Sequence, residues 1–226
     1  TICSPITPEG YSGVAVIRLS GSKTLSILKK ISSLCDPLES HKSYLTKIVR
    51  DKNVVDQVLV TYFKQGQSFT GDETVEISCH GNPMVVNQII QLCCSHGCRL
   101  AEKGEFSFRS FYNGKIDLVQ AESIRSFIHT NNQPGMSQSM QHLQGHLSDE
   151  FKYIENRIIE ALGFLEVSID FVEQDIGNIE YKEVSASLNV TLEKVQGLLK
   201  SYDLGKNLES GFRVLLLGAV NVGKSS

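Results

Sequence analysis

The stretch Thr74-Val-Glu-Ile-Ser-Cys79, followed by His80-Gly-Asn-Pro83, sets the fold class of the first half of the chain. Its apolar side chains alternate with polar ones, which is the period-two pattern of a half-buried strand. The asparagine and proline after it are typical of a helix start, because proline has no N–H to lose in the first turn. The stretch therefore predicts a strand that leads into a helix.

Upstream of this stretch the same mixture recurs. Residues 13–19 are β-rich and are bounded by turn residues, and residues 24–31 carry helical spacing. Residues 43–49 and 54–63 are strand-like and are separated by Arg50-Asp-Lys-Asn53, so they predict an antiparallel hairpin. Because strict β-α-β alternation is missing, we expect residues 1–118 to form an α+β domain.

From about residue 117 the strand patterns vanish and helical spacing takes over. Pro134-Gly135 is expected to break the helical pattern. The apolar stripe that follows it, with steps of three and four over residues 136–165, predicts one unbroken helix. A second stripe covers residues 184–199. We expect both stripes to form the core of an all-α helical-bundle domain over residues 119–210, rather than a cofactor or membrane site.

Gly205 and Gly211 mark the expected exit from these helices into a third segment, residues 211–226. There an apolar run, Val214 to Leu217, is typical of a buried strand, and Gly218-Ala-Val-Asn-Val-Gly-Lys-Ser225 follows it directly. This spacing predicts a P-loop, in which backbone N–H groups surround phosphate oxygens, the lysine lies near the β/γ-phosphates and the serine hydroxyl binds Mg²⁺. A chance glycine-rich turn is the alternative.

Composition limits the remaining classes of function. The chain has 226 residues, of which 41% are hydrophobic and 21% charged, as in ordinary globular proteins. Its formal net charge of -3 argues against broad, sequence-blind nucleic-acid binding. The sequence shows neither a membrane-span pattern nor a signal-peptide layout, so we expect a cytoplasmic location and no membrane partner.

Six cysteines are present, and we expect them to be free thiols in a reducing compartment. A metal cluster is the alternative, because Cys79-His80 could be combined with three later cysteines. The spacing matches no paired Cys-x-x-Cys pattern, which favours buried thiols. The cysteines are Cys3, Cys35, Cys79, Cys93, Cys94 and Cys98.

Three segments of unusual composition occur in a distinctive order. They are Phe69-Thr-Gly-Asp-Glu-Thr-Val-Glu-Ile-Ser-Cys-His-Gly81, Gly104-Glu-Phe-Ser-Phe-Arg-Ser-Phe-Tyr-Asn-Gly-Lys-Ile-Asp-Leu-Val-Gln-Ala-Glu122 and Leu143-Gln-Gly-His-Leu-Ser148. Together with Ile169-Asp-Phe171 and the P-loop, they resemble the MnmE (TrmE) family of tRNA modification GTPases. The resemblance extends over the whole chain.

The resemblance implies a folate-binding N-terminal domain that also forms a homodimer and is similar to the folate-binding domain of aminomethyltransferases. It implies a helical domain into which a P-loop α/β GTPase domain is inserted. It further implies that, with the flavoprotein MnmG, such proteins install a carboxymethylaminomethyl-type group at the 5-carbon of the tRNA wobble uridine. The implied one-carbon unit is linked to folate.

By the same resemblance, contacts to 5-formyl-tetrahydrofolate fall on Arg18, Glu76 and Lys115. GTP contacts fall on the last six residues, with a potassium ion at the asparagine and Mg²⁺ at the first of the two serines. Chemistry favours Glu76 at the pterin, since a carboxylate can accept two adjacent N–H donors. Without the resemblance, the three folate-site residues would be ordinary surface charges. The P-loop residues are Asn221, Val222, Gly223, Lys224, Ser225 and Ser226.

The chain departs from the family pattern in a few places. Val220 stands where proline is usual, Tyr11-Ser12 where Arg-Gly is usual, and Ala15 where glycine is common. Because magnesium-binding, base-reading and switch segments would lie beyond Ser226, we expect residues 1–226 alone not to hydrolyse GTP. The alternative function is a dimeric folate-binding scaffold with an inert P-loop, and an aminomethyltransferase without a GTPase would need no P-loop at all.

Overall fold

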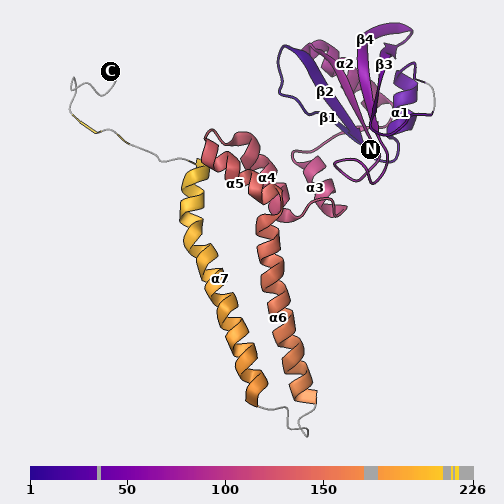
Figure 1. Ribbon diagram of the computed structural model, residues 1–226. Helices are drawn as coiled ribbons and strands as arrows, with labels where there is room; N and C mark the ends of the chain where they lie inside the picture. Colours follow the sequence, from indigo (N-terminus) through magenta and orange to yellow (C-terminus); the bar gives the residue numbers. More distant parts are fainter. Residues whose placement is uncertain (35–36, 171–177, 211–214, 216, 219–226) are drawn as a thin grey trace. The chain divides into compact units, whose positions relative to one another are not determined.

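The computed structural model describes residues 1–34, 37–170, 178–210, 215, 217 and 218 of the chain (Figure 1). The chain divides into two compact units, Thr1–Asp117 and Leu118–Ser226. The first contains a mixed sheet with helices and the second is helical, so the predicted α+β and all-α architectures are confirmed.

The first unit is built on a six-stranded sheet with the strand order β3-β4-β5-β2-β1-β6. Neighbouring strands are antiparallel, except for the parallel pair β1 and β6. The four longer strands confirm the sequence prediction, whereas the two short ones were not predicted, because so few residues show no clear period. The strands are β1 Ile2–Pro5, β2 Ser12–Ser20, β3 Lys42–Arg50, β4 Asn53–Phe63, β5 Thr74–Gly81 and β6 Arg99–Leu100.

The predicted hairpin between β3 and β4 is present, and its turn explains the pairing. Asp51 and Lys52 have φ angles of 49° and 70°. Two consecutive residues with positive φ form the primed turn whose twist matches that of the flanking strands.

Two helices, α1 (Thr24–Ile31) and α2 (Pro83–Ser95), contribute side chains to the core on one face of the sheet. As predicted, α2 starts at the proline, and the Asn82 side chain accepts a hydrogen bond of 2.9 Å from the Met84 N–H. On the opposite face, Leu45 and Leu59 are exposed. That open face carries the candidate site.

The second unit contains α4 (Leu118–His129), α5 (Gln133–Leu143), α6 (His146–Asp170) and α7 (Asn178–Ser210). The long helices α6 and α7 lie side by side, and α4 and α5 lie near one end of this pair (Figure 1). No described helix has the length and apolar composition needed to cross a membrane.

Three helix predictions for this unit were wrong in detail. The expected single helix over residues 136–165 is broken at Gly145, whose φ of 92° is left-handed and ends α5. Pro134-Gly135 lies inside the first turn of α5, where the Asn132 side chain accepts a hydrogen bond from the Gly135 N–H. Gly205 lies within α7 and does not end it, because one glycine costs a helix only about 1 kcal/mol.

The expected helical core is also incomplete. Leu162 on α6 and Leu192 on α7 are both more than half exposed, although they belong to the apolar stripes. The smaller Ala161 and Thr191 are the buried positions beside them. Two helices bury only the narrow strip along which they touch, so a wide apolar face stays exposed.

Candidate functional site in the N-terminal unit

Arg18 on β2 and Glu76 on β5 form an ion pair on the open face of the sheet. The two residues are directly opposite in the antiparallel register. Arg18 donates from Nε and Nη2 to Oε1 of Glu76 at 2.9 and 2.7 Å. Their side chains are only 17% and 25% exposed. Two of the three residues predicted together for one binding site are therefore direct partners in the structure.

The arrangement of this pair leaves one acceptor available. The Nε and Nη2 groups of Arg18 both donate to Oε1 of Glu76. The other oxygen, Oε2, accepts no hydrogen bond from the residues that the structure describes. A carboxylate held rigidly by one oxygen presents the other in a fixed direction. This site can accept an N–H donor from a ligand.

The ion pair belongs to a polar row that crosses five strands. Residues opposite one another in an antiparallel sheet share a face, and the register places the five members of this row side by side. On the β3 side of the row, the hydroxyl groups of Ser43 and Thr61 hydrogen-bond each other at 2.8 Å. The row is Ser4, Arg18, Glu76, Thr61 and Ser43.

Two phenylalanine rings enclose the guanidinium group. The Cζ atom of Arg18 lies 5.3 Å from the ring centroid of Phe69 and 5.5 Å from that of Phe106. Contacts at this distance attract the cation through the ring quadrupole and restrict its rotamers. Arg18 is thus held by a carboxylate and two rings.

Phe69 is carried by the loop of residues 66–72, which is anchored by hydroxyl groups. The Thr70 hydroxyl lies 2.7 Å from that of Ser20 and 3.3 Å from those of Ser68 and Thr74. All four side chains are buried. Buried hydroxyls that satisfy one another fix the backbone that bears them, so this loop is held against the end of the sheet.

Helix α3 (Glu105–Tyr112) carries Phe106 and contributes to the site through a charged cluster at its start. Glu105 accepts hydrogen bonds from Arg99 on β6 and, at 3.1 Å, from Arg109. Chiefly because of the bond from Arg99, the pKa of Glu105 is lowered to about 2. The cluster therefore ties α3 to the edge of the sheet.

Lys115 follows α3 and contacts the 66–72 loop. Its ammonium group donates a hydrogen bond to the Gly66 carbonyl oxygen. In the part of the chain that the structure describes, Lys115 thus contacts the loop and not the ion pair. The structure brings Arg18 and Glu76 together, and it connects Lys115 to them through the loop that carries Phe69.

No role was predicted from the sequence for Phe69, Phe106, Ser110 or Asn113, although each lies within the segments quoted above. Positions 106, 110 and 113 are spaced by four and three residues, which is the pattern of one helix face. That spacing was the signal in the sequence that could have identified Phe106, Ser110 and Asn113 as one group.

The described cysteines are free thiols, and four of the five are buried. Burial is the first cause that raises the pKa of Cys79, to about 11. Sγ of Cys3 lies 4.0 Å from Sγ of Cys94, and a hydrogen bond with Cys93 is the main cause that raises the pKa of Cys3. Among the described residues, His, Cys, Asp and Glu form no group of three or more suited to a metal ion.

The residues predicted to bind GTP at the P-loop lie outside the part of the chain that the structure describes. They are Asn221, Val222, Gly223, Lys224, Ser225 and Ser226. A strand was expected over Val214 to Leu217, of which Leu215 and Leu217 are described, and both are exposed. Because the other two residues lie outside the described part of the chain, this strand stays a prediction.

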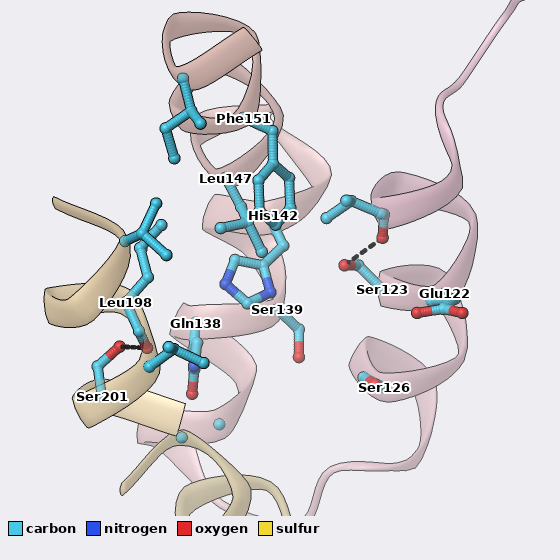
Figure 2. Close-up of a pocket in the computed structure, with 16 residues that line it drawn as sticks. Glu122, Ser123, Ser126, Gln138, Ser139, His142, Leu147, Phe151, Leu198 and Ser201 are labelled. Atoms are coloured by element: carbon cyan, nitrogen blue, oxygen red, sulfur yellow. Dashed lines mark hydrogen bonds between the residues drawn. The ribbon is translucent and has the colours of Figure 1, made fainter. Parts of the chain in front are cut away.

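The second unit has a cavity of about 820 Å³ between its helices. Polar side chains such as Ser123, Ser139 and His142 come from α4 and α5, and apolar ones such as Phe151 and Leu198 come from α6 and α7 (Figure 2). The Ser123 hydroxyl donates to the carbonyl oxygen of Val119 in its own helix. No residue of this cavity was predicted from the sequence to bind a ligand.

The family models and the curated relatives that match this chain all belong to one family. Residues 1–115 match the model of the GTP-binding protein TrmE N-terminus, and residues 118–219 match that of the MnmE helical domain. Curated relatives include proteins described as "tRNA modification GTPase MnmE" from Bdellovibrio bacteriovorus and Chlamydia felis, which are 42% and 39% identical to the whole chain. A protein of the same description from Acetivibrio thermocellus is 36% identical.

These matches cover all of the chain but 48%, 51% and 50% of the three relatives. The chain thus spans about half the length of the curated relatives it matches. The two family models follow one another in the order of the two structural units. The chain therefore belongs to the MnmE (TrmE) family, of which it contains the N-terminal domain and the matched part of the helical domain.

Proposed function

We propose that the N-terminal unit binds a reduced folate, such as 5-formyl-tetrahydrofolate, through Arg18, Glu76 and Lys115. The observation that carries this proposal is the carboxylate of Glu76, whose Oε1 is held by Arg18 while Oε2 accepts no hydrogen bond from the described residues. A reduced pterin presents an amino group and a ring N–H, which are donors suited to a carboxylate. The rings of Phe69 and Phe106 beside the pair fit a flat ligand.

Calorimetric titration of the chain with 5-formyl-tetrahydrofolate tests this proposal. Glu76→Gln replaces one acceptor oxygen by a donor and is expected to weaken binding by about 2 kcal/mol or more. Glu102→Gln, at an exposed position near α3, is the matched control and is expected to bind as wild type does. Equal affinity of the Glu76 variant and the wild type would remove Glu76 from the site.

We propose that the whole protein is a GTPase of tRNA wobble-uridine modification. Membership of the family and the names of the relatives support this role. In this proposal residues 1–118, 119–210 and 211–226 are the folate-binding domain, the helical domain and the start of the inserted GTPase domain. Residues 221–226 would bind GTP, with K⁺ at Asn221 and Mg²⁺ at Ser225.

The modified group would be of the carboxymethylaminomethyl type and would be installed in the cytoplasm together with the flavoprotein MnmG. The one-carbon unit would come from the folate, which supplies that chemistry when bound. The residues of this chain bind and orient the folate. Mass spectrometry of tRNA nucleosides from cells that carry only Glu76→Gln in place of the wild type tests the role, and unchanged levels of the modified uridine would contradict it.

The same unit is proposed to form a homodimer. Strand β3 is a long edge of the sheet, and Leu45 and Leu59 are exposed on its open face. Exposed edges and apolar faces are ordinarily covered by a partner. Sedimentation equilibrium is expected to show a dimer that Leu45→Glu weakens, whereas the control Leu162→Glu in the helical unit leaves it intact. A wild-type monomer at high concentration would contradict the proposal.

A scaffold without GTPase activity remains the second candidate for residues 1–226 themselves. It is supported by the fact that the site described above lies wholly within the first unit. If the P-loop is inert in this chain, no GTP turnover is expected from it at high potassium concentration. Turnover at the rate of typical GTPases would contradict the scaffold.

A further inference from the structure

The segment after Gly104, singled out in the sequence but given no function beyond Lys115, contacts the 66–72 loop through four side chains. Arg109 forms an ion pair of 3.0 Å with Asp72. Asn113 donates to the Thr70 carbonyl oxygen at 2.7 Å, and Lys115 donates to that of Gly66. The fourth contact is from the Ser110 hydroxyl to the Phe69 carbonyl oxygen, at 2.7 Å.

Ser110 differs from the other three in being completely buried. Its hydrogen bond ends on the backbone of Phe69, the residue whose ring lies over Arg18. Its helix also carries Phe106, the second ring over Arg18. One hydroxyl thus joins the two elements that enclose the guanidinium group.

The backbone conformation at Gly71 allows the loop to approach the α3 segment closely. Gly71 has a φ of 80°, and a Cβ atom there would lie 3.0 Å from Cβ of Asn113. Glycine permits both the left-handed conformation and the short distance. The loop is therefore in direct contact with the helix segment, and no water layer is needed between them.

We propose that Ser110 is a positioning residue, which holds Phe69 in place so that Arg18 keeps its bonds to Oε1 of Glu76 and leaves Oε2 open. The part that concerns a ligand rests on the proposed folate site, and the part that concerns Arg18 does not. Removing the hydroxyl leaves the Phe69 carbonyl oxygen without the donor of this part-buried hydrogen bond. The ring then moves from Arg18, and the guanidinium must be ordered again when a ligand binds.

The first test is spectroscopic and needs no ligand. The Nε–Hε resonance of Arg18, identified by its loss in Arg18→Lys, is expected to be shifted by the two rings. In Ser110→Ala it is expected to move toward the position of an exposed arginine such as Arg125. The matched control is Ser123→Ala, another buried helical serine, which donates within its own helix and is expected to leave Arg18 unchanged.

The second test is calorimetry with 5-formyl-tetrahydrofolate. Ser110→Ala is expected to weaken binding about tenfold, and to have no further effect in a Phe69→Leu background. A resonance of Arg18 that stays in place, or an equal loss of affinity in both backgrounds, would overturn the positioning role. If the wild type shows the Arg18 shift but binds no folate, the proposed function fails and the positioning role stands.

Asn113→Ala keeps the experiment decisive should Ser110→Ala fail to fold. Asn113 is exposed, and its side chain holds the neighbouring Thr70 carbonyl oxygen. Its removal opens no cavity in the core and is expected to move the Arg18 resonance in the same direction by a smaller amount. An Arg18 resonance identical to that of the wild type would contradict the role of this contact in positioning.

Discussion

The two units of this chain place their apolar residues very differently. In the first unit, side chains such as Ile17, Ile77 and Ile89 are completely buried between the sheet and its helices. In the described part of the second unit, Ala161 is the one buried apolar side chain, and large residues such as Leu162 stay exposed. An apolar stripe thus predicts a helix reliably, but whether it is buried depends on what packs against it.

The largest expected effect is on the stability of the first unit. Ile77→Ala removes a fully buried side chain and is expected to lower the free energy of unfolding by about 3 kcal/mol. Leu162→Ala, at a half-exposed position of the second unit, is expected to cost less than about 1 kcal/mol. Urea denaturation followed by circular dichroism measures both, and similar costs would remove the contrast between the units.

A second prediction concerns the break between α5 and α6. Gly145 has a φ of 92°, so Gly145→Ala is expected to destabilise the second unit by about 1 kcal/mol or more. Gly163 lies within α6, and a Cβ atom there would meet nothing within 4 Å. Gly163→Ala is therefore expected to stabilise by up to about 1 kcal/mol. Thermal unfolding with the same sign for both variants would contradict the break at Gly145.

A third and smaller effect is the pH dependence of the first unit. The pKa of Glu105 is lowered to about 2 in the folded chain, against about 4.3 for an unperturbed glutamate. The charged Glu105 carboxylate therefore stabilises the folded chain above the unperturbed pKa of about 4.3. This stabilisation is lost as the pH falls from there toward 2. We expect Glu105→Gln to flatten the loss of stability between pH 5 and about 2.5. An unchanged slope in acid denaturation would show that the charged cluster with Arg99 does not contribute.

The sequence predicted the fold of the first unit well, because apolar and polar side chains alternate along its longer strands and its turns contain typical turn residues. Thr24–Ile31 was predicted at its observed bounds, and the Asn82 cap was visible from its residue type. Strands β1 and β6 were missed, since their pairing depends on distant residues. The sequence pattern thus predicts the elements that local interactions determine, and it misses those that depend on pairing with distant residues.

The candidate site was only partly predictable. Arg18 and Glu76 were selected by resemblance, but their direct pairing depends on the register of β2 against β5, which no local pattern contains. The two rings over Arg18 come from segments far apart in the sequence. The role of Glu76 thus stays a prediction, now with one carboxylate oxygen bound by Arg18 and the other without a hydrogen bond among the residues that the structure describes.

Hydrogen exchange of the chain with and without 5-formyl-tetrahydrofolate tests the central claim most directly, because it reports on both units in one measurement. We predict that the ligand protects amides of β2, β5, the 66–72 loop and α3, and leaves those around the cavity of the helical unit unchanged. Protection confined to α4, α5 and α7, or none at saturating ligand, would contradict a folate site at Arg18 and Glu76.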